Sequence, residues 1–437
     1  MSIYDFHPSS SSTGLGTLPN AGSEPPHPFK GHTGLWASTV LAPMDGVTDL
    51  AMRLWLALVG APPFAVTPFL RVTSDYPTGR IPLDFCPPEE RDLGLEVRPQ
   101  LMGSCPATLA RFANHLLQTH DTVDINMGCP APRVVGHSGG SALIRCHASL
   151  SAFMDRLFDR VPPGRVSIKT RLGFDSADEA DNLVGILVSF PLAELTLHGR
   201  TRSQRYGGRA DWPVIGRLAA DAPVSVAGSG DVTSVEKLQE VRRLAPCARR
   251  IFIGRGLLRN PWMSHEVAAG GPVRIPLETL IEALRCFVLV NQILMPKRLD
   301  HLTIGPLIRC LAGIRQDLFK SGCNSMHQQY WQTIRQFLEL ERNDLDATAS
   351  ASCSRLKMLW SYLFTSLPGT LNTTSLLRAR SAAEFFEELS HAAQESSHCG
   401  ASEIQIRANP EWDWRFAGQG RRNVTNLAPT SGEDGNP

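Results

Sequence analysis

The sequence predicts an α/β protein: a (β/α)8 barrel, or TIM barrel, followed by an α-helical C-terminal domain. Three observations predict this fold. Eight short apolar segments alternate with helical segments over about 230 residues, near the usual size of such barrels. Glycine-rich turns follow the last two of these segments and not the first. The alternation stops near residue 272, and only helical periodicity follows it.

The apolar segments define the predicted strands, and the residues between them define the helices. A first helix is capped by Thr48 or Asp49 and carries Ala51, Leu54, Trp55 and Leu58 on one face, and another starts near Pro106. The eight predicted strands are 39–42, 64–69, 96–102, 123–126, 166–171, 193–197, 224–227 and 250–253.

Composition narrows the class of protein. The chain has 437 residues, 42% hydrophobic and 19% charged, with a net charge of +1, so a polyanionic partner would need a local basic patch. No apolar run approaches the ~20 residues that cross a membrane, and we expect no secretory signal. The ten cysteines include no C-x-x-C pair. We therefore expect a cytoplasmic protein with free thiols and no metal site. We also expect a monomer.

The late glycine turns distinguish a barrel from its rival, a doubly wound open sheet. That sheet would place a glycine-rich phosphate turn after its first strand. Here the turns 228–231 and 254–256 follow the seventh and eighth strands, where barrels often hold phosphate. Glycine lets a phosphate approach backbone N–H groups closely, although each turn alone could be an ordinary tight connection.

A cysteine follows the fourth strand in a stiff turn. Val123 and Ile125 alternate with polar residues, Gly128 ends the strand, and Pro130 biases Cys129 toward an extended conformation. Such a thiol can contact a ligand, or it can be a buried structural cysteine. We interpret the other nine cysteines as packing or surface residues.

Closure of the barrel would gather the polar residues at the strand ends in one mouth. Each of them alone could be a solvated side chain. Together they provide a thiol, amide and basic groups and a phosphate cradle, which suit a phosphate-bearing cofactor with a planar head group. These residues are Met44, Gln100, Asn126, Cys129, Lys169, His198 and Arg255.

Six short motifs follow one another along the predicted barrel: Ala42-Pro43-Met44, Gln100-Leu101-Met102-Gly103, Asn126-Met127-Gly128-Cys129-Pro130, Lys169-Thr170-Arg171, His198-Gly199-Arg200-Thr201 and Gly254-Arg255-Gly256. In this order they resemble the motifs of the FMN-dependent tRNA-dihydrouridine synthases over about residues 37–270. Three further features, Arg71, Ser138-Gly139-Gly140 and Tyr206, are similar to the bacterial branch that modifies position 16 of tRNA.

The resemblance implies a role for each matching position. Cys129 would be the catalytic acid, and His198 would lie near flavin and substrate. Ser229 stands where the family usually has Asn, and its shorter hydroxyl can still donate to a flavin oxygen. The other implied FMN-binding residues are Pro43, Met44 and Asp45 along the ring, Gln100 and Lys169 at its polar edge, and Ser229, Gly230, Asp231, Gly254 and Arg255 at the ribityl and phosphate groups.

The implied reaction suits these residue types. Saturation of the uracil 5,6 double bond needs a hydride at C6, which the flavin supplies, and a proton at C5. An unperturbed thiol, with a pKa of about 8.5, is mostly protonated at pH 7 and can act as that acid. NADPH, or NADH, would be the electron donor.

The helical half carries the implied tRNA contacts. The segment 277–293 has an apolar helical stripe, and so does the segment 355–363 through Leu356, Leu359, Trp360 and Leu363. Basic residues beside the second stripe could simply snorkel on a bundle helix, whereas the resemblance implies that this domain grips tRNA. The implied tRNA-binding residues of the whole chain are Arg71, Asn126, Tyr206, Arg355, Lys357 and Tyr362.

One segment departs from the family. Residues 294–350 form a helical insertion with two apolar stripes, either a structural elaboration or a change in how tRNA docks. The stripes are Leu307, Cys310, Leu311 and Ile314, and Trp331, Ile334, Phe337 and Leu338. We thus predict a disordered tail over 1–32, a catalytic barrel over 33–271, a helical tRNA-binding domain over 272–399 and a mostly disordered tail over 400–437.

Two other functions stay open. An FMN barrel oxidoreductase acting on a small unsaturated ring, such as a free pyrimidine, would explain the barrel motifs but not the helical half. A catalytically silent tRNA-binding protein would explain the helical half, but it would not need Cys129, Lys169 and His198.

Overall fold

A computed structural model describes residues 34–131, 139–294, 301–341, 349–363, 375–398 and 403–405. The tail predicted over 1–32, Ser138 and most of the segment 400–437 lie outside these residues. Within the described chain, no helix is long and apolar enough to cross a membrane.

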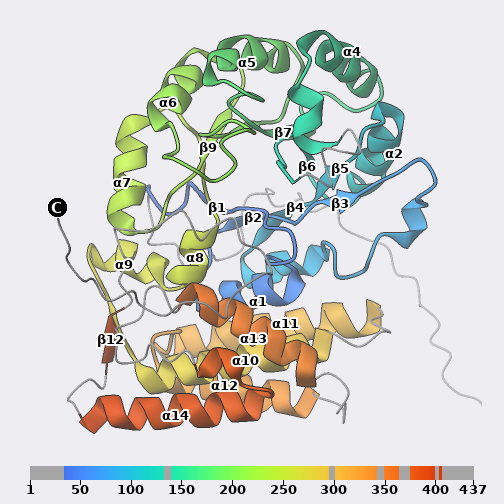
Figure 1. Ribbon diagram of the computed structural model, residues 1–437. Helices are drawn as coiled ribbons and strands as arrows, with labels where there is room; N and C mark the ends of the chain where they lie inside the picture. Colours follow the sequence, from blue (N-terminus) through green and yellow to red (C-terminus); the bar gives the residue numbers. More distant parts are fainter. Residues whose placement is uncertain are drawn as a thin grey trace, which may run out of the picture.

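Ten parallel strands form one curled sheet, and helices surround it (Figure 1). The order of the strands in the sheet is β3-β5-β6-β7-β8-β9-β10-β1-β2-β4. Their bounds are β1 Thr39–Leu41, β2 Phe64–Val66, β3 Leu70–Arg71, β4 Glu96–Arg98, β5 Gln100–Met102, β6 Val123–Asn126, β7 Val166–Arg171, β8 Leu195–His198, β9 Val226–Ser229 and β10 Ile251–Ile253.

Pro99 closes this sheet into a barrel. It separates β4, which pairs with β2, from β5, which pairs with β6. One stretch of chain therefore connects β4, at one end of the strand order, to β5, the neighbour of β3 at the other end. The carbonyl oxygen of Arg98 accepts from the Thr67 amide at 3.0 Å, and that of Pro99 accepts from the Asp124 amide at 2.9 Å. The (β/α)8 barrel is thereby confirmed. The predicted strand 96–102 is divided because proline has no N–H to donate.

The predicted strand 64–69 also ends early. It stops at Val66, before Pro68, and the chain then forms the short strand β3 beside β5. The helices that follow the barrel strands are α1 Leu50–Val59, α2 Pro106–Leu116, α4 His147–Phe158, α5 Ala180–Val188, α6 Trp212–Asp221, α7 Val235–Leu244, α8 Arg255–Arg259 and α9 Met263–Ala269.

Helix α1 is buried along its whole length, although its sequence predicts a single apolar face. Asp49 caps it, as predicted, by accepting the Met52 amide at 3.1 Å. Its outer side is covered by the helical domain: the Trp55 indole donates to the Ala283 carbonyl at 2.7 Å and meets Phe287 edge-on. Helix α1 is therefore a shared wall between the two halves.

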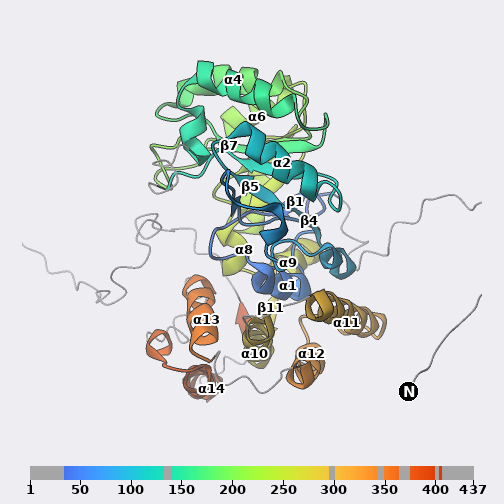
Figure 2. The same cartoon turned by 90° about the vertical axis from the view of Figure 1, so that its right-hand side faces the viewer.

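The C-terminal helices lie together beside α1, α8 and α9, as both ribbon views show (Figures 1 and 2). Their apolar faces continue the core between the sheet and the barrel helices, and a separate small core of six side chains fills the barrel itself. The helices are α10 Leu277–Leu294, α11 His301–Lys320, α12 Gln328–Glu341, α13 Ala349–Leu363 and α14 Ala382–His398.

The insertion packs on the barrel. The Tyr330 hydroxyl donates to the Leu58 carbonyl at 2.8 Å, and Arg315 donates to the Leu93 carbonyl at 2.5 Å. The stripe predicted on α12 is buried except for half-buried Phe337, but Cys310 on α11 is exposed, contrary to its predicted place in a stripe. Ile308 takes the buried position instead, because the buried face of α11 is rotated toward the barrel.

A short antiparallel pair joins β11 (Arg274–Pro276) to β12 (Glu403–Gln405). The second of these strands lies inside the segment 400–437, which the sequence predicts as mostly disordered. Three residues give too short an alternation to indicate a strand from sequence.

Candidate active site

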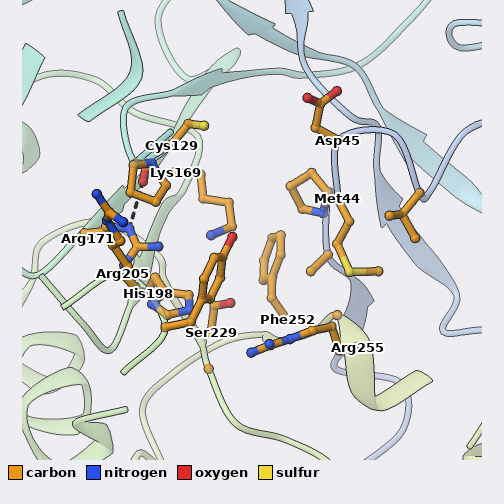
Figure 3. A pocket seen from close by; sticks show the side chains of 18 of the residues that line it. Met44, Asp45, Cys129, Lys169, Arg171, His198, Arg205, Ser229, Phe252 and Arg255 are labelled. Atoms are coloured by element: carbon orange, nitrogen blue, oxygen red, sulfur yellow. Dashed lines mark hydrogen bonds between the residues drawn. The ribbon is translucent and has the colours of Figure 1, made fainter. Parts of the chain in front are cut away.

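A cavity of about 700 Å³ opens at the carboxyl ends of the barrel strands. Figure 3 shows Cys129 and Lys169 on one side of it and Met44 and Asp45 on the other. Its lining includes fifteen predicted site residues: Pro43, Met44, Asp45, Gln100, Asn126, Cys129, Lys169, His198, Tyr206, Ser229, Gly230, Asp231, Gly254, Arg255 and Tyr362.

The Cys129 turn is held by the last residue of β6. The side-chain oxygen of Asn126 accepts the backbone N–H groups of Gly128 at 3.1 Å and of Cys129 at 2.9 Å. On the other side, the Cys129 carbonyl accepts from the buried Ser141 hydroxyl at 2.8 Å. A Cβ at Gly128 would lie 3.2 Å from the Thr170 backbone, so glycine lets the turn pack tightly on β7.

The same asparagine connects the turn to Gln100. The Asn126 amide donates to Gln100 Oε1 at 2.9 Å, and Gln100 Nε2 donates to the buried carboxylate of Asp124 at 2.7 Å. Both amides are thereby fixed in orientation. Burial raises the pKa of Asp124 to about 6, and nearby Arg98 partly offsets that rise.

Three titratable groups in the cavity are shifted toward their neutral forms. Burial raises the pKa of the Cys129 thiol, and it lowers the pKa of Lys169 to about 8 with help from Arg171. Burial and the neighbouring cations lower the pKa of His198 well below its usual range. At neutral pH the cavity therefore presents a thiol, a neutral imidazole and one weakly held proton on Lys169.

Arg171 also lines the cavity and is missing from the predicted site residues. Its guanidinium donates to the carbonyls of Gly128 at 2.8 Å, Thr201 at 2.9 Å and Arg205 at 2.7 Å. It thus joins the Cys129 turn to the loop after β8. The sequence did indicate this position. Arg171 lies two residues after Lys169, which was predicted to line the site, and residues two apart on a strand face the same side.

The glycine turns after β9 and β10 lie against each other. Gly230 has φ 131° and Asp231 φ 55°, and a Cβ at Gly256 would overlap the Val232 carbonyl oxygen. The Asp231 carboxylate accepts from Arg200 through both oxygens, at 2.8 and 2.7 Å, and from the Ala210 amide at 2.7 Å. The side chain of Asp231 therefore holds the loop after β8, and only the backbone of Asp231 is available to bind an anion.

An aromatic and basic cluster lines the cavity beside these turns. The Tyr206 ring receives the guanidinium of Arg171 at 5.7 Å and that of Arg255 at 5.0 Å. Burial lowers the pKa of Arg259 to about 10 and also lowers that of Arg255. Tyr362 reaches the lining from helix α13, so the helical domain contributes to the cavity wall. Arg259 and Phe252 also line it and were not predicted.

Three predicted tRNA-binding residues do not line the cavity. Arg71 lies half-buried on β3. Lys357 donates to the Ala379 carbonyl at 3.0 Å, inside the helical half. Arg355 contacts the loop between β1 and α1. None of these contacts tests RNA binding, so these roles stay predictions.

Outside the cavity, the remaining cysteines of the described chain form no disulfide. No group of three or more potential metal ligands is found among the described residues.

The fold and the cavity define a barrel enzyme with a thiol, amides and basic groups at one rim. A model of the family described as dihydrouridine synthase (Dus) matches residues 40–287. The chain belongs to the dihydrouridine synthase family, which confirms the resemblance inferred from its motifs.

Several relatives, three of which follow, carry the name tRNA-dihydrouridine(16) synthase. The one from Pseudomonas syringae pv. tomato is 32% identical over 52% of this chain and 74% of its own length. The one from Escherichia coli K12 is 30% identical over 56% of this chain and 80% of its own. The one from Cupriavidus necator is 34% identical over 52% of this chain and 72% of its own.

Among solved structures, an old yellow enzyme homologue from Zymomonas mobilis covers 54% of this chain and 89% of its own at 12% identity, with a TM-score of 0.39.

Proposed function

We propose that this protein is a flavin-dependent oxidoreductase that reduces the 5,6 double bond of a uridine in the D-loop of tRNA, at position 16. FMN is the proposed cofactor and NADPH, or NADH, the electron donor. One observation carries the proposal: the protonated thiol of Cys129 lines the same cavity as Gln100, Lys169 and the two glycine turns.

The cavity suits a flavin in size and in donors. A volume of about 700 Å³ lies within the usual range for cofactor sites. His198 Nδ1 is buried without a hydrogen-bond partner among the described residues. Because such a group normally finds a partner, it favours a polar ligand in the cavity.

Different residues would bind different parts of the flavin. Pro43, Met44 and Asp45 would lie along the ring, and Gln100 and Lys169 would donate to its polar edge. Ser229 and Gly230, with Gly254 and Arg255, would hold the ribityl and phosphate groups, together with the backbone of Asp231. When bound and reduced, the flavin supplies a hydride to C6 of uracil.

Cys129 would donate the proton to C5. Burial raises its thiol pKa, so the group stays protonated at neutral pH. Asn126 would hold the turn in place and face the base, while neutral His198 would pack near flavin and substrate. A general acid must keep its proton until it reacts. The low-dielectric surroundings of Cys129 disfavour the charged thiolate and so keep the thiol protonated.

The substrate would be a base from an unpaired loop. Such a base costs less to extrude into a pocket than one in a duplex. Tyr206, Tyr362 and Arg71 would contact the RNA near the mouth, and Lys357 is proposed on the helical domain. Position 16 is proposed because the relatives named above carry that position in their names.

The same proposal covers the organisation of the chain. Residues 33–271 would form the catalytic barrel and 272–399 the helical tRNA-binding domain, with 294–350 as its insertion. The protein would act as a monomer in the cytoplasm.

The test measures bound flavin and NADPH oxidation in the purified protein, and it maps dihydrouridine in cellular tRNA. The purified protein should be yellow, and unmodified tRNA should stimulate its oxidation of NADPH, whereas free uracil should not. Dihydrouridine at position 16 should disappear from tRNA of cells that lack the gene. Stimulation by free uracil alone would favour the small-ring reductase, and a colourless protein that still binds tRNA would favour the silent binder.

A further inference from the structure

Helix α13 reaches the wall of the cavity with one of its faces. Arg355 and Tyr362 lie seven residues apart, so they share that face. Tyr362 lines the cavity directly. Arg355 instead contacts the loop between β1 and α1, whose residues 43–45 and 47 line the cavity.

The guanidinium of Arg355 is occupied by this loop. It donates to the Gly46 carbonyl at 2.7 Å, to the Val47 carbonyl at 3.0 Å and to the carboxylate of Asp49 at 2.6 Å. The side chain is 14% exposed. It holds two neighbouring carbonyls and the cap of α1 at the same time, which only the planar fork of arginine can do.

The loop between β1 and α1 is also held by hydrogen bonds of its own, to which the contacts of Arg355 are added. The Met44 amide donates to the Thr48 hydroxyl at 2.9 Å, and the amides of Val47 and Thr48 both donate to the Met44 carbonyl at 3.0 Å. Met44 stands beside the turn after β10, since a Cβ at Gly254 would lie 3.3 Å from its sulfur. Arg355 thus fixes a loop that connects two sides of the cavity.

We infer that Arg355 is a positioning residue for the cofactor: it acts from the helical domain by fixing the loop 43–47, and it is not a ligand of RNA phosphate. The inference rests on the proposed function, because it takes the cavity to be a flavin site. It also links the docking of the helical domain to the affinity of the barrel for its cofactor.

Lys357 provides the contrast. It lies two residues away on the same helix, carries the same charge, and donates to Ala379 inside the helical domain. Arg355 could reach a phosphate only by giving up its ion pair with Asp49 and its two carbonyl partners. Lys357 would give up one carbonyl.

The experiment compares Arg355→Met with Lys357→Met in the full-length protein. FMN is titrated into flavin-stripped protein, and tRNA binding is measured at several salt concentrations. Arg355→Met should raise the Kd for FMN at least about fivefold, the lower end of typical coupling between sites. Its salt slope for tRNA should equal that of the wild type, since losing a phosphate contact would reduce the slope by about 0.7 to 0.9. Lys357→Met should leave the Kd for FMN unchanged.

One further variant and one further measurement test whether a general loss of folding explains the effect of Arg355→Met. Asp49→Asn keeps an N-cap but removes the ion pair, so it should weaken FMN binding in the same direction and add little to Arg355→Met. Saturating FMN should restore the turnover of Arg355→Met with an unchanged KM for tRNA.

An unchanged Kd for FMN in both Arg355→Met and Asp49→Asn would overturn the inference, and so would a reduced salt slope in Arg355→Met. A wild-type protein that binds no FMN would instead refute the proposed function itself.

Discussion

The side-chain oxygen of Asn126 accepts the backbone N–H of Cys129 at 2.9 Å, while its amide nitrogen donates to Gln100 Oε1 at 2.9 Å. One side chain therefore sets both the turn that carries the thiol and the orientation of the amide predicted at the flavin edge. The proposed proton donor and the proposed cofactor site thus share a single support.

Removing this support should slow the reaction more than it weakens cofactor binding. For Asn126→Ala we expect kcat at saturating tRNA to fall about 10- to 100-fold, because small displacements of a reacting group are costly. FMN stoichiometry, read from absorbance, should stay near that of the wild type. Asn126→Asp keeps the acceptor for the turn but loses the donor to Gln100, so it should retain more activity than Asn126→Ala. Wild-type kcat in Asn126→Ala would contradict this role.

Lys169 should make cofactor binding depend on pH. Burial lowers its pKa to about 8, so it is charged below that pH and neutral above it. If the charged form binds FMN, affinity must fall as pH rises: at pH 9 about one-tenth of the lysines are protonated, and the Kd should be about tenfold higher than at pH 7. Fluorescence titration of FMN measures this.

The control for that experiment is Lys169→Arg. Arginine stays charged throughout this range, so the variant should show no such decline. A flat profile in the wild type would remove Lys169 from the cofactor site.

At the opposite end of the barrel, Glu194 should matter for stability alone. Its buried carboxylate pairs with Arg98 at 3.0 Å and with Arg250 at 2.8 Å. Glu194→Ala leaves a buried arginine uncompensated, which should lower the free energy of unfolding by about 3–5 kcal/mol. Urea denaturation gives this value, and the Kd for FMN should not change at a temperature where the variant is folded.

Asp181→Ala is the matched comparison, because it breaks an exposed ion pair with Arg217. We expect a change close to the error of the measurement, since exposed pairs contribute little. An equal loss in both variants would show that burial of Glu194 is not the cause.

Strands without proline were predicted well, and contacts between distant segments were not. The predicted strand 166–171 has the same bounds in the structure, because the side chains of its six residues alternate between two faces without interruption. Pro68 and Pro99 shortened or divided two other strands, which local apolarity could not reveal. Most of the fifteen predicted residues in the cavity lie at strand ends or in the turns beside them, and a barrel brings strand ends together. Tyr206 lies farther along the loop after β8, and Tyr362 comes from helix α13.

Two contacts near the cavity join segments that lie far apart in the sequence. Arg355 finds its partners 306 to 309 residues away, which spacing along a helix cannot indicate. The carboxylate of Asp231 pairs with Arg200, thirty-one residues earlier, which its motif could not indicate. Sequence patterns indicated residues that line one cavity, whereas the pairing of charges around it needed the fold.

The central claim is that the Cys129 thiol delivers the proton. The most direct test reduces the FMN of the wild type and of Cys129→Ala, adds unmodified tRNA, and follows flavin reoxidation without oxygen in a single turnover. We predict equal FMN content and a rate at least about 100-fold lower in Cys129→Ala, the usual contribution of a general acid. A wild-type rate in that variant would contradict the account.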